Sequence, residues 1–117
     1  MQGFGTYVRA QRERLSKDSK DFSVRKVAMK IGVEPAFLSK VEREVVPPPS
    51  EGKIIALSEV LDEDQDVLLA MAGKVSSDLL KVIRDRPVLF AELIRKLKTE
   101  PDHAVLRIVR EVKDGEW

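Results

Sequence analysis

The segment from residue 23 to residue 43 constrains the fold most, because it holds two short helical segments separated by one glycine. Ser23 is a suitable N-cap, since its hydroxyl accepts a hydrogen bond from an otherwise unpaired first-turn amide. The next apolar residues recur at three- and four-residue spacing, which predicts a helix over residues 24–31. Gly32 ends that helix, because glycine adopts the left-handed conformation without steric penalty.

A second helix is predicted from Ala36 to about Glu44, only a few residues later. Pro35 suits its first turn, because the amide that proline lacks has no helical partner there. Glu34 just before it interacts favourably with the helix dipole. Three prolines at residues 47–49 end the helix, since proline disfavours helical backbone in the residue before it.

Helical periodicity continues through the rest of the chain without the alternation typical of strands, so the predicted fold class is all-α. Further helices are expected at residues 3–15, 51–61, 64–72, 76–84, 87–98 and 101–112, with a solvated loop at 16–22. The expected core residues are Val8, Ala28, Ile31, Leu38, Val41, Leu57 and Leu68. Ser50 is expected to cap the fourth helix, and Val67, Leu68 and Met71 are expected to face inward from the fifth.

Gly73 marks the expected domain boundary, because it ends the fifth helix. Residues 1–73 then form one domain, and residues 74–117 form a helical C-terminal extension. A hydrophobic content of 43% is enough for one core in a chain of 117 residues. With no cysteine, no signal peptide pattern and no apolar run near the ~18 to 20 residues of a membrane span, we expect a soluble cytoplasmic protein.

The charge is segregated along the chain, although its net value is only +1. Residues 1–45 carry ten Lys and Arg against six Asp and Glu, a net charge of +4. Residues 46–73 carry one against six, a net charge of −5, and residues 74–117 carry ten against eight. A basic surface backed by an acidic one is typical of a protein that faces nucleic acid. Ordinary scatter of surface charge explains the same numbers equally well.

Two short helices joined by a tight glycine-containing turn form the helix-turn-helix pattern. Ala28 lies in the first of these helices, where the second must cross closely and a small side chain permits the approach. In such a motif the second helix lies in the major groove of DNA, which is ~12 Å wide and admits one α-helix. The segment therefore predicts DNA recognition by its second helix.

Further motifs accompany this pattern: Phe4-Gly5, Val8-Arg9 and Arg12 in the first helix, Leu38-Ser39-Lys40-Val41-Glu42-Arg43 in the recognition helix, and Leu61 followed by DEDQDVLLAMAG. With Ala28 and Gly32, they closely resemble the Xre/Cro family of lambdoid phage repressors and bacterial regulators over about residues 4–72. The resemblance implies a five-helix lambda repressor-like DNA-binding domain. It also implies an ion pair between Arg12 and Glu42 that fixes the recognition helix.

The sequence departs from the family pattern at two places. The loop before the motif is longer than usual, which places Lys17 and Lys20 near the site where the family meets the phosphate backbone. The glycine that often follows Glu-Arg is replaced by Glu44. The second departure moves the exit of the recognition helix toward the three prolines.

The resemblance also implies which side chains meet DNA. Bases are expected to be met by Pro35, Ala36, Phe37, Ser39 and Lys40, and phosphates by Arg25, Lys26 and Arg43 together with Lys17 and Lys20. Ala36 and Phe37 suit thymine methyl groups, and Lys40 suits guanine O6 and N7. Two simpler interpretations stay open, namely Phe37 as a core or turn-packing aromatic and Lys40 as a solvated lysine.

No group of residues indicates catalysis, a metal or a cofactor. His103 is the only histidine and has no ligand-type residues at metal-binding spacing. The segment DEDQD at residues 62–66 resembles half of a calcium loop but lacks its central glycine and terminal glutamate. It is better explained as the acidic first turn of a helix. We expect a protein with no enzymatic activity and no cofactor.

The C-terminal third carries two apolar stripes, which we interpret as a dimer interface. Its expected residues are Leu89, Leu93, Ile94, Leu97, Leu106, Ile108 and Val109. A homodimer suits two-fold operators, since one helix reads too few base pairs for specificity. The stripes would alternatively fold back on their own domain or hold a toxin or metallopeptidase partner. The sequence thus predicts a repressor of double-stranded operator DNA; the alternative is an antitoxin or adaptor that binds a partner protein and autoregulates its operon.

Overall fold

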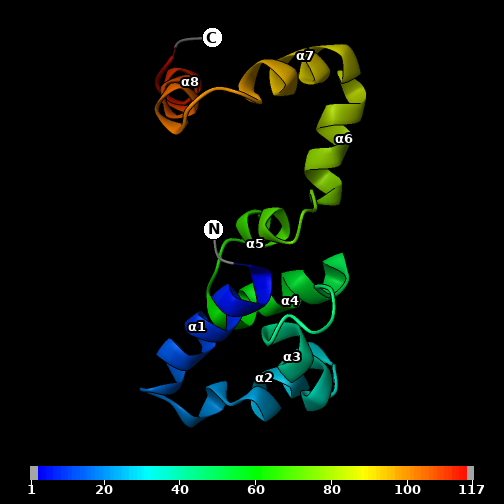
Figure 1. Ribbon diagram of the computed structural model, residues 1–117, viewed down its shortest axis with the longest axis vertical. Helices are drawn as coiled ribbons and strands as arrows, with labels where there is room; N and C mark the ends of the chain where they lie inside the picture. Colours follow the sequence, from blue (N-terminus) through cyan, green and yellow to red (C-terminus); the bar gives the residue numbers. More distant parts are fainter. Residues whose placement is uncertain (1–2, 116–117) are drawn as a thin grey trace. The chain divides into compact units, whose positions relative to one another are not determined.

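The computed structural model describes residues 3–115, and every regular element in this range is helical (Figure 1), which confirms the all-α class. None of these helices has both the length and the apolar composition that a bilayer span requires. The elements are α1 (Phe4–Ser16), the 3₁₀ turn η1 (Lys20–Phe22), α2 (Val24–Ile31), α3 (Pro35–Glu42), α4 (Glu51–Leu61), α5 (Gln65–Met71), α6 (Ser77–Asp85), α7 (Pro87–Leu97) and α8 (Asp102–Asp114).

Three local features differ from the predicted pattern. Helix α3 ends at Glu42, before the expected end near Glu44, because Glu44 has a φ of 60°, which no right-handed helix continues. The turn η1 forms within the expected loop, since the Ser19 hydroxyl accepts a hydrogen bond from the Asp21 amide at 3.2 Å. The cap expected from Ser50 is wrong: its side chain is exposed and makes no hydrogen bond to the first turn of α4.

The hydrophobic core of the first five helices contains all seven residues expected there. It is completed by Phe4, Val27, Ile54, Leu61 and Leu69. The inward face of α5 was only partly predicted. Leu68 and Leu69 pack against the core, which turns Val67 outward with 49% of its surface exposed.

Four helices end at a residue in the left-handed conformation, which turns the chain sharply and satisfies the last carbonyls. At the end of α2 the Val33 amide bonds to the Ala28 carbonyl at 3.0 Å, and at the end of α3 the Val45 amide bonds to the Lys40 carbonyl at 2.9 Å. The left-handed residues are Gly32, Glu44, Asp62 and Gly73. Two of the four turns are thus made without glycine.

The chain divides into two compact units, Met1–Ser77 and Asp78–Trp117. The division lies beyond the boundary expected at Gly73, because the following residues are bonded to the start of α4. The Lys74 ammonium donates to the Pro49 carbonyl at 2.9 Å. The amide and the hydroxyl of Ser77 donate to the Glu51 carboxylate at 2.8 and 2.7 Å. Glu51 therefore binds both donors of Ser77, the last residue of the first unit.

Candidate nucleic-acid interface

The pair α2 and α3 is fixed from behind by the core and by one lysine of α4. The Ser23 hydroxyl accepts a hydrogen bond from the Lys26 amide at 3.2 Å and so caps α2. At the other end of α2, the Lys53 ammonium donates to the Ile31 and Gly32 carbonyls at 3.0 and 3.3 Å. A cation at a helix C-terminus also favours the helix dipole. Sequence reasoning gave Lys53 no such role, because the contact joins residues 22 positions apart in the chain.

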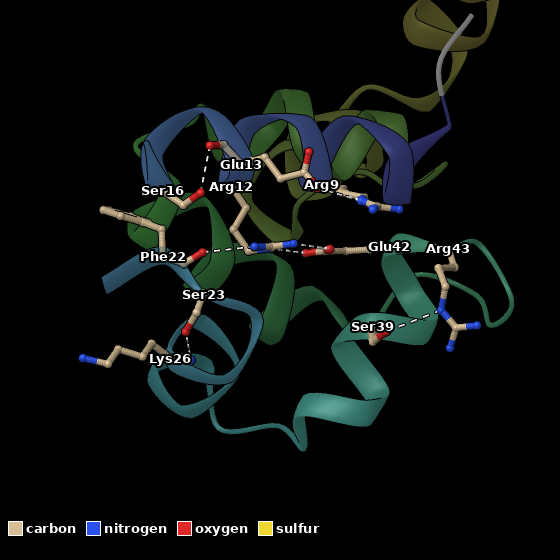
Figure 2. A network of polar contacts seen from close by, with 10 residues as sticks. All are labelled: Arg9, Arg12, Glu13, Ser16, Phe22, Ser23, Lys26, Ser39, Glu42 and Arg43. Atoms are coloured by element: carbon tan, nitrogen blue, oxygen red, sulfur yellow. Dashed lines mark hydrogen bonds and ion pairs between the residues drawn. The ribbon is translucent and has the colours of Figure 1, made fainter. Parts of the chain in front are cut away.

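Arg12 of α1 and Glu42 of α3 form a buried two-pronged ion pair (Figure 2). The Arg12 Nε donates to Glu42 Oε2 at 2.7 Å, and Nη2 donates to Oε1 at 2.9 Å. The third nitrogen, Nη1, donates to the Phe22 carbonyl at 3.1 Å. A planar guanidinium therefore joins α1, the end of α3 and the turn before α2, and it fixes the position of α3.

The side of α3 opposite this pair is open to solvent. Leu38 and Val41 face the core, whereas Pro35, Ala36 and Lys40 are exposed. Phe37 is 37% exposed and does not belong to the core, so only the turn-packing form of the simpler interpretation stays open. The half-buried Ser39 accepts a hydrogen bond from Arg43 Nε at 3.4 Å, which holds the arginine along the helix (Figure 2).

Basic side chains are also exposed on the segments that precede and follow α3 in the chain. The five residues expected at phosphates, Lys17, Lys20, Arg25, Lys26 and Arg43, are all exposed. Lys26 forms a loose ion pair with Asp21 at 3.6 Å, and the other four have no ion-pair partner within residues 3–115. Exposed cations without a carboxylate partner are available for an external anion.

Two further exposed residues of α2 were not assigned from the sequence. The Lys30 ammonium lies 5.3 Å from the centre of the Phe22 ring, a cation–π contact that joins η1 to α2. Met29 presents an apolar side chain that is 65% exposed. The Lys30–Phe22 contact has no local sequence signal, because it depends on how η1 folds back. The exposure of Met29 follows from the spacing of Val27, Ala28 and Ile31, which puts Met29 outside the buried face of α2.

The surroundings of three groups on α1 shift their pKa values. Arg9 donates to Glu13 at 2.8 Å, which lowers the pKa of the Glu13 carboxyl and raises that of Arg9. Partial burial, with a hydrogen bond to Glu63, raises the pKa of Tyr7 above its ordinary value. These groups keep their usual charges near neutral pH.

The described residues offer a binding surface and no cluster of three or more His, Asp or Glu side chains that would hold a metal. Comparisons of the chain with models of known protein families, with curated proteins and with solved structures give no match. The function of the surface is therefore inferred from its own residues.

Proposed function

We propose that this protein is a DNA-binding transcriptional regulator that reads a DNA sequence with α3 and represses transcription by occupying a promoter. One observation carries the proposal. Helix α3 is held by the buried Arg12–Glu42 pair, while its outer residues and the basic side chains of the neighbouring segments are exposed. The proposed role is binding, with no catalytic step.

The dimensions and charges of this surface suit duplex DNA. An α-helix with its side chains is ~10 to 12 Å across, which matches the ~12 Å width of the major groove. Lys40 is exposed and would donate to guanine, and Ala36 and Phe37 would contact thymine methyl groups. The flanking Lys17, Lys20, Arg25, Lys26 and Arg43 would neutralise phosphates.

Helices α1 to α5 follow in the order that the Xre/Cro resemblance implies. We include in the proposal that they form a lambda repressor-like domain. In that arrangement α2 and α3 are the helix-turn-helix, and Glu44 turns the chain out of the recognition helix in place of glycine.

The test is selection of bound sequences from a random duplex pool with the full chain, followed by binding titrations at several salt concentrations. Each phosphate contact adds about −0.9 to the slope of log K against log salt.

Lys40→Ala should relax preference at one base position at a cost of about 1–3 kcal/mol, whereas Arg43→Ala should weaken binding to all sequences alike. Lys113→Ala in α8 is a matched control and should change neither the base preference nor the overall affinity for DNA. A flat salt dependence with no enriched sequence would refute the proposal.

A second candidate function is favoured by one observation, the exposed apolar side chains of α7 and α8. In this alternative the chain is an antitoxin or adaptor whose C-terminal helices bind a toxin or protease, and DNA binding serves autoregulation. A neighbouring open reading frame whose product forms a stable complex with the purified chain would support it. A chain that binds its operator fully without such a product would oppose it.

A further inference from the structure

A cleft of about 550 Å³ lies in the first unit, where three segments that are far apart in the sequence meet. They are the start of α1 at residues 3–5, the end of α3 with the chain at residues 44–48, and the end of α5 with residues 72–73. Such a volume falls within the ~300–1,000 Å³ that is usual for sites of small molecules. The described residues that line the cleft include none of those proposed to contact DNA.

The walls of this cleft are apolar apart from one carboxylate. Among the described lining residues, Glu44 has the only polar side chain. The rest are glycines or apolar residues, among them Phe4, Val45, Pro47 and Met71. In a small-molecule site, a few polar groups within an apolar lining fix the orientation of the ligand.

The Glu44 carboxylate is held against the start of α1. Its Oε2 accepts a hydrogen bond from the Thr6 hydroxyl at 3.0 Å, and its Oε1 lies so close to Gly3 that a Cβ on that glycine would overlap it. Glu44 is exposed and has no ion-pair partner within residues 3–115. A carboxylate has about four acceptor positions, so this group can accept further hydrogen bonds.

The backbone of Glu44 also sets this position apart. Its φ of 60° is left-handed, a conformation that is strained for a residue with a Cβ and free for glycine. Strained residues of this kind cluster at sites that hold ligands. The turn thus holds a carboxylate at the cleft where the backbone alone favours glycine.

We infer that the cleft binds a small amine with an apolar ring, whose ammonium group pairs with Glu44 while the ring contacts the apolar walls. The sign of the charge selects this ligand, because an anion would be repelled by Glu44 and a neutral molecule would lack a charge-assisted hydrogen bond. Met71 suits a ring, since a methionine sulfur makes favourable contacts with aromatic edges. Val41 at the end of α3 also lines the cleft, so the amine would touch the proposed recognition helix. An effector role would rest on the proposed function; the binding site itself does not.

The first test titrates the full chain without DNA by calorimetry, using three indole compounds that differ in one group. Tryptamine carries an ammonium, tryptophol a hydroxyl and indoleacetate a carboxylate. Tryptamine should bind about tenfold or more tightly than tryptophol, because only the ammonium forms a charge-assisted bond to Glu44, and indoleacetate should bind least. Similar affinities for the three compounds, or no saturable binding of tryptamine, would overturn the inference.

The second test removes the charge and locates the ligand. Glu44→Gln keeps an oxygen that accepts from Thr6, and it should raise the dissociation constant of tryptamine by about tenfold or more while leaving that of tryptophol unchanged. Glu59→Gln in α4 is the matched control, since Glu59 is exposed and lies outside the cleft; its affinity for tryptamine should equal that of the wild type. Tryptamine should also shift the amide resonances of Gly5, Val45 and Gly73 in the wild type.

Unchanged tryptamine affinity in Glu44→Gln, or resonance shifts confined to the acidic residues 62–66, would overturn the inference. Because neither test contains DNA, a chain that binds no amine would leave the proposed regulator to its own selection and salt experiments. A chain that binds the amine and ignores DNA would refute the regulator alone.

Discussion

At the residue scale, the buried pair of Arg12 and Glu42 is the most consequential contact. Only 8% and 5% of the two residues is exposed, so either one left alone would be a buried charge without a partner. Glu42→Ala should therefore lower the free energy of unfolding by about 3–5 kcal/mol, and adding Arg12→Met should recover much of the loss. Urea denaturation measures both. Glu13→Ala breaks an exposed pair on the same helix and should leave the midpoint nearly unchanged; an equally small effect at Glu42 would contradict the buried geometry.

Glu44 is the residue whose backbone is least expected. It is left-handed, and its carboxylate accepts a hydrogen bond from the Thr6 hydroxyl at 3.0 Å. Both Glu44→Ala and Glu44→Gly lose that bond, but only alanine keeps the left-handed strain. The glycine variant should thus be the more stable by about 1 kcal/mol. At the helical position Glu59 the order should reverse, because alanine is the better helix former. Thermal unfolding of the four variants decides; alanine ahead of glycine at both sites would show that the left-handed turn is absent.

The backbone of Glu44 is a feature that its residue type does not predict. Gly32 and Gly73 are predictable helix ends, because glycine readily adopts a positive φ. Glu44 and Asp62 also have a positive φ and end helices, but their residue types do not predict it. Apolar spacing predicted the core of the first unit, since periodicity reports which face is buried. Bonds that join distant segments, such as Lys53 to Ile31, have no local pattern and needed the structure.

At the scale of elements, the approach of α1 to the end of α3 depends on Gly5. A Cβ at this position would overlap the Val41 carbonyl, which is backbone and cannot rotate away. Gly52 in α4 has nothing within 4 Å of the corresponding position. Gly5→Ala should therefore destabilise the fold, while Gly52→Ala should stabilise it by about 0.5–1 kcal/mol through helix propensity. Equal melting temperatures for the two variants would contradict the close crossing of α1 and α3.

At the scale of the whole molecule, the bonds of Lys74 and Ser77 make the first unit longer than the helix pattern alone predicts. A fragment of residues 1–77 keeps the bonds to Pro49 and Glu51, and one of residues 1–73 loses them. All twelve buried apolar residues lie in both fragments. Both should fold, and the longer one should be more stable by about 1–3 kcal/mol in urea. Identical urea midpoints for the two fragments would show that the first unit ends at Gly73.

The placement of the buried ion pair has a consequence for how such a protein can diverge. The α3 side chains that anchor the helix, Leu38, Val41 and Glu42, are all buried. Substitutions at Ala36, Phe37 or Lys40 therefore leave these anchoring contacts intact and should change the free energy of unfolding only slightly. The exposed residues of α3 can therefore change during evolution independently of the buried residues that keep the helix in place.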